Sequence, residues 1–362
     1  MEFGIFNLLS RRVESQTIAS IVEEAAETVK LADQAGFTTA WFPEHHYSNY
    51  SIAPSPLMMC AYCASLTQRI KLGTAIVIGT LYHPARLVSE VAFVDGMTNG
   101  RLVLGFGSGY QPHEFKRFGI DLEHSPDITE EVLDIVEGGL TNEAFEYHGK
   151  HFDFPHTYMA LRPVQNPMPQ VWIAGNNAQM QQRAARSGYP LIISALVKDI
   201  DFVASLREMA EKNWHEAGVD PASMQLGTLR FSYVTDSHED ALEFGDNARF
   251  QYRLARNLRF RKEELHKGLL PEVPFEDEPT LEELVANNPI GDPETVAERI
   301  VEEVRRVNAF HMNLYMHVGS MPLEKSLRSI ERFASEVMPL VEKELGEPVT
   351  AAATTTWAVH RD

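Results

Sequence analysis

Short apolar strands alternate with amphipathic helices along this 362-residue chain, and that alternation limits the folds open to it. The N-terminal residues MEFGIFNL predict a strand, and residues 18–35 predict a helix that ends at Gly36. The β-branched run IKLGTAIVI indicates a buried strand, because strands covered on both faces of a parallel sheet are apolar throughout. The alternation continues to a strand MNLYMHV and a last helix over residues 322–344.

The pattern gives about eight strand–helix units, and eight such units with right-handed crossovers close into a ring. We therefore predict an α/β fold, a single (β/α)8 TIM barrel over residues 1–345. A doubly wound open sheet is the alternative. The chain has no break in composition at its middle, which favours one closed domain.

Three segments depart from the alternation. Residues 141–169 form a long excursion rich in histidine, proline and aromatic residues. Residues 256–288 have no clear period, and a long irregular segment in a compact domain is usually a functional lid or disordered. We interpret 256–288 as an insertion that forms a mobile active-site lid. The low-complexity tail, residues 346–362, is expected to be disordered.

Charge and composition exclude several classes of partner. The net charge of −19 repels phosphate backbones and anionic lipid, so nucleic acid and membrane surfaces are poor partners. No apolar run approaches the ~20 residues that span a bilayer. The N-terminus lacks the pattern of a signal peptide, so we expect a cytoplasmic protein.

Metal and redox motifs give no convincing site. Cys60 and Cys63 form a C-x-x-C pair, but their surroundings are apolar and predict a buried helix, where cysteine acts as a small hydrophobe. The excursion contains His148, His151 and His156, whose spacing matches no helical ligand pair. We predict no metal.

His45 is the strongest single catalytic candidate. The active site of a TIM barrel lies at the carboxyl ends of the strands, and His45 directly follows the second predicted strand. An imidazole titrates near neutral pH and can move protons to and from a reacting group. A histidine that only caps a loop is the alternative. His46 is expected to point away, since adjacent side chains at a strand end diverge.

Two further strand ends carry residues suited to a ligand. The run GFGSGY, residues 105–110, is not a Rossmann fingerprint: its third glycine comes one residue early, and Pro112 is expected to interrupt the segment after the run. Its glycines would let backbone approach a flat or phosphorylated ligand, although a plain tight turn is the alternative. Asn176 and Asn177 open a predicted helix, where backbone N–H groups bind anions and asparagine also acts as a simple cap.

Several separated blocks, in the same order, resemble the bacterial luciferases, which are alkanal monooxygenases. The resemblance covers residues 1–345. Its blocks are MEFGIFNLL with GFTTAWFPEHHYSNY, the long stretch IKLGTAIVIGTLYHPARLVSEVAFVDGMTNGRLVLGFGSGYQPHEFKRFGID, RPVQNPMPQVWIAG, RAARSGYPLIIS, NPIGDPETVAERI and SEVMPLVEKE.

The resemblance implies a flavin-dependent monooxygenase of TIM-barrel fold. Such an enzyme uses reduced FMN and O2 and oxidises a small organic substrate, such as an aliphatic aldehyde, through a flavin C4a-hydroperoxide. The chain has no NAD(P)H fingerprint, so a separate flavin reductase would supply the reduced FMN. The resemblance implies that His45 is catalytic. It also implies that the isoalloxazine packs on a bulge at Ala75 and Ile76, which is often a cis peptide. Gly107, Ser108 and Gly109 would contact the flavin ring and phosphate, and Asn176 and Asn177 would contact the phosphate.

The chain also departs from that pattern. The luciferase catalytic subunit has a reactive cysteine at the position of Gly107 and phosphate-binding arginines at the positions of Ser108 and Pro126. The phosphate would then rest on backbone amides or on Asn176 and Asn177. Two alternatives stay open on these grounds: a barrel of the same fold that uses the deazaflavin F420, and a luciferase-like partner subunit without catalysis. Light emission is not implied.

Partners and substrate contacts complete the expectations. Apolar faces in the helices over residues 56–66 and 84–97 would form the interface of a homodimer or a luciferase-like heterodimer. Strand-end position alone suggests substrate contacts for Phe42, Tyr110, Tyr158, Ala195 and His317.

Overall fold

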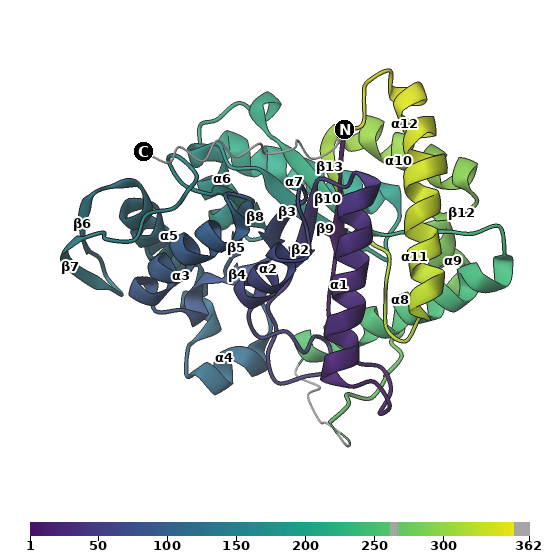
Figure 1. The fold of residues 1–362 in the computed structure, drawn as a ribbon, viewed down its shortest axis with the longest axis horizontal. Coiled ribbons are helices and arrows are strands. Elements are labelled where there is room, and N and C mark those ends of the chain that lie inside the picture. Colours follow the sequence, from purple (N-terminus) through teal and green to yellow (C-terminus); the bar gives the residue numbers. More distant parts are fainter. Residues whose placement is uncertain (261–265, 267, 351–362) are drawn as a thin grey trace.

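The computed structural model describes residues 1–260, 266 and 268–350 and has a closed parallel β-sheet at its centre (Figure 1). The barrel strands are β1 (Glu2–Phe6), β2 (Thr39–Phe42), β3 (Lys71–Thr74), β4 (Val77–Ile78), β5 (Leu102–Gly107), β8 (Gln170–Ala174), β9 (Leu191–Leu196), β10 (Leu226–Phe231) and β13 (Ala309–Tyr315).

The sheet closes because β3 pairs with both β2 and β5, and β13 pairs with both β1 and β10. β3 and β4 share one position in the ring, since β4 continues along β5 after the ladder between β2 and β3 has ended. The predicted (β/α)8 TIM barrel is confirmed, and the open sheet is excluded.

Helices follow most barrel strands and form an outer layer. They are α1 (Ile18–Ala35), α2 (Pro56–Ala64), α3 (Pro84–Thr98), α4 (Pro112–Phe118), α5 (Ser125–Thr141), α6 (Ala178–Ser187), α7 (Ile200–Glu216), α8 (His238–Arg259), α9 (Leu281–Ala286), α10 (Pro293–Val307), α11 (Leu323–Arg332) and α12 (Met338–Leu345). α1 and α11 pack side by side, so the first helix adjoins the helix that follows β13 (Figure 1). A π-helical turn, Phe333–Val337, separates α11 from α12, where the sequence predicted one helix.

Short strands lie outside the barrel. The excursion after α5 contains an antiparallel hairpin of β6 (Ala144–His148) and β7 (Asp153–Tyr158), while β11 (Tyr233–Val234) pairs with β12 (Ile290–Gly291). The hairpin turn is fixed by the carboxylate of Glu131, which accepts hydrogen bonds from the backbone N–H groups of three successive residues, 150–152. The hairpin histidines pair with acids, and the described residues contain no group of side chains that could hold a metal.

Two apolar clusters stabilise the fold. One fills the space between the barrel and the helices and includes Phe3, Val29 and Leu133. Cys60 and Cys63 are buried in it, as predicted, and burial raises the pKa of the Cys63 thiol to about 12. The other cluster occupies the barrel interior and continues through its open end to α8, with Trp41, Trp172, Phe231, Tyr315, Leu258 and Leu270 among its members.

The segment after the glycine run, residues 105–110, differs from its expected form. Pro112 does not interrupt the segment after the glycine run. It is the first residue of α4, a position where its missing N–H costs nothing, so that expectation was wrong.

The expected lid and tail are only partly described. Residues 256–259 complete α8, residues 281–286 form α9, and residues 261–265 and 267 lie outside the described residues. In the expected tail, the N–H of Thr350 donates to the carbonyl of Met1, and residues 351–362 lie outside the described part. Among the described helices, none is both long enough and apolar enough to cross a membrane.

Candidate active site at the barrel mouth

His45 lies at the carboxyl end of the barrel and pairs with a glutamate from the loop after β5. Its Nδ1 is 3.1 Å from Oε1 of Glu114, which lies in the first turn of α4. The imidazole is 8% exposed and Glu114 is fully buried. Burial is the largest single influence on Glu114 and disfavours its charge, but the imidazole of His45 and the N–H of His46 together lower its pKa. Glu114 is therefore an ionised carboxylate that orients His45.

A second buried glutamate joins the loop after β2 to β4. One oxygen of Glu44 is 2.9 Å from Nε2 of His46, and the other accepts a hydrogen bond of 3.0 Å from the N–H of Ile78. Burial raises the pKa of Glu44 despite these bonds. The two adjacent histidines therefore have different carboxylate partners. The ring of His46 packs against Phe118 and so turns away from His45, as expected.

Two tyrosines border His45. The ring of Tyr50 lies edge-on to the imidazole with centroids 4.7 Å apart, and Tyr110 lies 6.0 Å away. The hydroxyls of these tyrosines are hydrogen bonded to each other, and Gln111 donates to the Tyr110 hydroxyl at 3.1 Å. Burial raises the pKa of both phenols, so they remain neutral. Tyr110 is 40% exposed and faces the mouth from the side of α4.

The predicted bulge after β3 forms a ledge beside this pair. The peptide bond between Ala75 and Ile76 is cis. Gly107 packs so closely on it that an added Cβ would lie 2.4 Å from Cδ1 of Ile76 and 3.1 Å from the carbonyl oxygen of Ala174. Only a glycine lets β5 approach the bulge in this way. Gly109 has a φ of +75°, a left-handed conformation that turns the chain into α4.

The loop that begins at Ser108 and the start of α6 both adjoin the start of α5. Ser125 donates a hydrogen bond to the backbone carbonyl of Ser108. Asn176 is exposed, and the side chain of Asn177 accepts from Met180, so Asn177 acts as the helix cap. Gln179, in the first turn of α6, donates to Asp127 at 3.1 Å and Glu130 at 2.9 Å. Two carboxylates therefore adjoin the start of this helix, and each also pairs with a cation, Asp127 with Lys150 at 3.6 Å and Glu130 with Arg186 at 3.4 Å.

Most of the substrate contacts suggested from strand position are placed elsewhere. Phe42 and Ala195 pack in the cluster between the barrel and the helices, and Tyr158 is 73% exposed on the hairpin. His317 bonds Ser326 at 2.9 Å and Glu24 at 3.3 Å, so it ties the end of β13 to α11 and α1. Of that set, only Tyr110 lies against His45.

Described parts of the expected lid are fastened beside the mouth. The N–H of Leu270 donates to the side chain of Asn49 at 2.8 Å, next to Tyr50, and Leu270 itself is buried. Farther along the segment, Glu272 pairs with Arg12 at 3.1 Å, and Glu278 pairs with Arg253 of α8. This strap, residues 268–280, connects α8 with the loops that follow β1 and β2.

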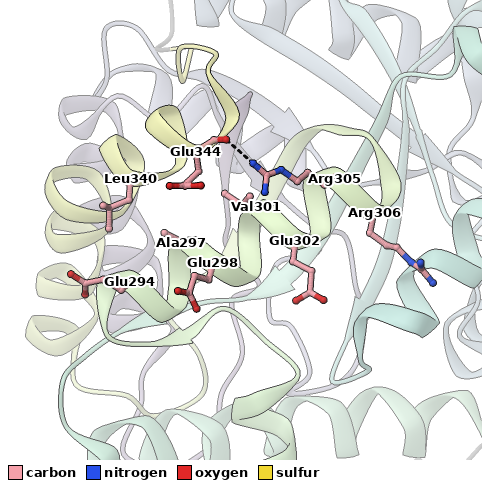
Figure 2. Close-up of a pocket in the computed structure, with 9 residues that line it drawn as sticks. All are labelled: Glu294, Ala297, Glu298, Val301, Glu302, Arg305, Arg306, Leu340 and Glu344. Atoms are coloured by element: carbon pink, nitrogen blue, oxygen red, sulfur yellow. Dashed lines mark hydrogen bonds between the residues drawn. The ribbon is translucent and has the colours of Figure 1, made fainter.

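A groove of about 720 Å³ lies on the outer helices, away from the strand ends. Figure 2 shows it between α10 and α12, with an apolar floor of Ala297, Val301 and Leu340 beneath several glutamates. Arg305 crosses one end and donates to the backbone carbonyl of Glu344. The groove shares no residue with the mouth, so its size alone does not mark it as the chemical site.

The sequence did not identify Glu44 and Glu114 as partners of the two histidines. Glu114 lies 69 positions from His45, and their contact depends on the turn into α4. Its place in the first turn after a glycine run was the available signal, because acids favour a helix start and the loops of a barrel meet at one mouth.

The fold and these contacts define a TIM-barrel protein whose strand-end loops build a histidine–carboxylate pair beside a glycine-backed ledge. The model of the luciferase-like monooxygenase family matches residues 1–309, and the chain belongs to that family.

Relatives extend over nearly the whole length. The uncharacterized protein y4vJ of Sinorhizobium fredii is 38% identical over 347 residues, covering 96% of this chain and 99% of the relative. The oxygenase component of the flavin-dependent trigonelline monooxygenase of Acinetobacter baylyi is 29% identical over 349 residues, covering 94% and 95%.

Solved structures share the fold. The oxygenating constituent of 3,6-diketocamphane monooxygenase of Pseudomonas putida, in complex with FMN, superposes with a TM-score of 0.75 at 21% identity, covering 94% of this chain and 98% of that one. An F420-dependent secondary alcohol dehydrogenase superposes with a TM-score of 0.70 at 17% identity, with the same coverage of the two chains.

Proposed function

We propose that this chain is the oxygenase component of a two-component flavin-dependent monooxygenase. In this proposal the barrel mouth binds reduced FMN, supplied by a separate flavin reductase, together with a small organic substrate. The observation that carries the proposal is the His45–Glu114 pair beside the Ile76–Gly107 ledge. The flavin-dependent relative that matches almost the whole chain supports the choice of cofactor.

The ledge fits a flat ring. Gly107 presents no side chain, and the side chain of Ile76 offers an apolar surface, so an isoalloxazine would be held by Ala75, Ile76 and Gly107. When bound, reduced FMN supplies the electrons that activate O2, so that one oxygen atom enters the substrate and the other leaves as water.

His45 holds and moves a proton in this proposal. Glu114 fixes Nδ1, which leaves Nε2 as the nitrogen that exchanges a proton with the bound reactants. Among the described residues, the imidazole of His45 forms a hydrogen bond through Nδ1 and none through Nε2. The neutral hydroxyls of Tyr50 and Tyr110 complete a polar edge around an otherwise apolar mouth.

Exclusion of water falls to the strap. Leu270 is buried beside the loop that contains Asn49 and Tyr50, so the strap covers part of the mouth with apolar surface. A closed, dry site protects reactive intermediates from water.

We expect the protein to bind the phosphate group of FMN weakly. Backbone N–H groups at the start of α6, with Ser108 and Asn176, are the groups proposed to meet the phosphate. Asp127 and Glu130 adjoin the same helix start through Gln179, and Lys150 and Arg186 partly balance their charges. At the positions of the two luciferase arginines this chain has Ser108 and Pro126. We therefore expect FMN to exchange freely between the reductase and this chain.

We also propose that the chain forms a dimer through α2 and α3. These helices pack together and expose large apolar side chains, while soluble monomers rarely expose wide apolar patches. The side chains are Met58, Tyr62 and Leu66 at α2 and Phe93 and Met97 of α3.

The test is an anaerobic titration with photoreduced FMN and reduced F420, followed by turnover in 18O2 with a flavin reductase and NADH. A substrate panel would include aliphatic aldehydes and carboxylated N-heterocycles. Binding of reduced FMN and one 18O atom per product would support the proposal. Hydride exchange with F420 alone would replace it by an oxygen-independent oxidoreductase, and binding of neither cofactor would indicate a partner subunit without catalysis.

A further inference from the structure

Glu44 lies where the barrel ladder is interrupted. β2 and β3 pair up to Phe42 and Thr74, and the N–H of Ala75 still donates to the carbonyl of Phe42 at 2.7 Å. Beyond this point the chain bulges through Ile76, and β4 pairs with β5 alone. The next connection from the loop after β2 to β4 is the 3.0 Å bond from the N–H of Ile78 to the Glu44 carboxylate. A side chain thus takes the place of a ladder hydrogen bond.

The carboxylate has partners on each side of the interruption. Its other oxygen is 2.9 Å from Nε2 of His46, and the hydroxyl of Tyr82 also bonds it. Glu44 is 2% exposed, so these bonds form with little competing water. His45 adjoins Glu44 in sequence, and the Ala75–Ile76 ledge lies just before Ile78, so the carboxylate joins the two sides of the site.

We propose that Glu44 is a positioning residue that sets the separation between His45 and the flavin ledge. The inference rests on the proposed function, because the ledge has a role only if a flat cofactor packs on it. Glu44 touches neither reactant. It acts by fixing Ile78, and therefore the bulge, against the loop that contains His45.

Asp33 provides a matched control at the opposite end of β3. Its carboxylate accepts backbone hydrogen bonds from Gln68, Arg69 and Ile70 at 2.6–2.9 Å, so it fastens the loop that enters the strand. Both acids are buried clamps of the ring position that β3 and β4 share, but only Glu44 is at the mouth. The amino-terminal face of a TIM barrel contributes to stability and the carboxyl-terminal face to chemistry.

The experiment compares Glu44→Ala, Glu44→Gln and Asp33→Ala in the full chain. Amide hydrogen exchange at Ile78 is measured without flavin, and FMN affinity and the visible circular dichroism of bound FMN are measured well below each melting temperature. We expect Glu44→Ala to expose the Ile78 amide, weaken FMN about tenfold, the size of one lost charged hydrogen bond, and alter the dichroism. Glu44→Gln retains an acceptor for Ile78 and should restore both readings.

Asp33→Ala should lower the melting temperature while FMN affinity stays at the wild-type value. Equal weakening by Asp33→Ala and Glu44→Ala would overturn the positioning role, because the effect would then be general loosening. An Ile78 amide that becomes exposed while affinity and dichroism stay unchanged would overturn it too. A wild-type chain that bound no flavin would instead refute the proposed function, and the positioning role would fall with it.

Discussion

Nδ1 of His45 and Oε1 of Glu114 are 3.1 Å apart, and the same carboxylate oxygen accepts the backbone N–H of His46 at 2.7 Å. One glutamate of α4 therefore fixes both the ring and the backbone of the loop after β2. The ring is therefore held in one orientation at the barrel mouth.

Replacing His45 by asparagine is expected to uncouple the reaction. Without the imidazole, reduced FMN would still be oxidised by O2, but oxygen transfer to substrate should fall by about 10²–10⁴-fold, the range for loss of a general acid–base. The measurement is product formed against hydrogen peroxide released. His46→Asn should cost less, and a His45→Asn variant with full coupling would remove His45 from the mechanism.

Glu114→Gln tests the carboxylate through stability. A lowered folded-state pKa stabilises the fold above the unfolded value, roughly 4.3, and this contribution disappears as pH falls through the folded-state pKa. We expect the variant to lose about 1.5–3 kcal/mol at pH 7 and the gap to the wild type to close below roughly pH 4.5. Urea unfolding of both proteins from pH 3 to pH 8 measures this difference in the free energy of unfolding.

In the same pH series, Glu44→Gln should change the free energy of unfolding in the opposite direction. Its folded-state pKa is raised, so ionisation of Glu44 costs stability above the unfolded value. The variant should therefore gain on the wild type in stability as pH rises above the unfolded value, roughly 4.3. If the stabilities of Glu114→Gln and Glu44→Gln, each relative to the wild type, changed with pH in the same direction, the opposite pKa shifts assigned to these two glutamates would be wrong.

Gly107→Ala should weaken the flavin at a modest cost to the fold. The new methyl would meet the flexible end of Ile76, which can move but would spoil the ledge, and it would lie a tight 3.1 Å from the backbone carbonyl of Ala174, so about tenfold weaker FMN binding is expected. Gly105→Ala is the contrasting variant. Its methyl would lie 1.9 Å from the backbone carbonyl of Thr74, which cannot move, so about 3 kcal/mol or more of stability should be lost. Fluorescence titration and thermal melts distinguish the two.

Phe93→Asp should convert the proposed dimer to a monomer, because Phe93 is 59% exposed on the apolar face of α2 and α3. Light scattering after size exclusion measures the mass. Met209→Asp changes a comparably exposed apolar residue of α7 and should leave the dimer intact. A wild type of monomer mass at micromolar concentration would exclude this interface.

The alternation of strands and helices was sufficient to predict the barrel, because each unit is encoded locally by its own periodicity and caps. It also placed His45, Ile76 and Gly107 at one mouth, because parallel strands end on the same side. The hairpin of β6 and β7 was missed because its strands are half exposed and carry no alternation strong enough to detect.

The direction of each side chain was harder to predict than its position along the chain. Ala195 is the penultimate residue of β9, yet strand alternation turns it toward the helices, while the neighbouring Ser194 lies on the other face of the strand and is exposed. The pairing of His45 with Glu114 depends on how the loop after β2 meets the start of α4. No local periodicity encodes such a contact.

The separation of the two apolar clusters has a consequence for how this scaffold can change. Phe3, Val29 and their neighbours hold the helices to the outside of the barrel, whereas the cluster that reaches the mouth shares its side chains with α8 and the strap. Substitutions that reshape the mouth therefore draw on a different set of contacts from those that keep the ring closed. A lineage built on this barrel can exchange one substrate for another by altering the inner cluster, while the outer one preserves the folded chain through each intermediate.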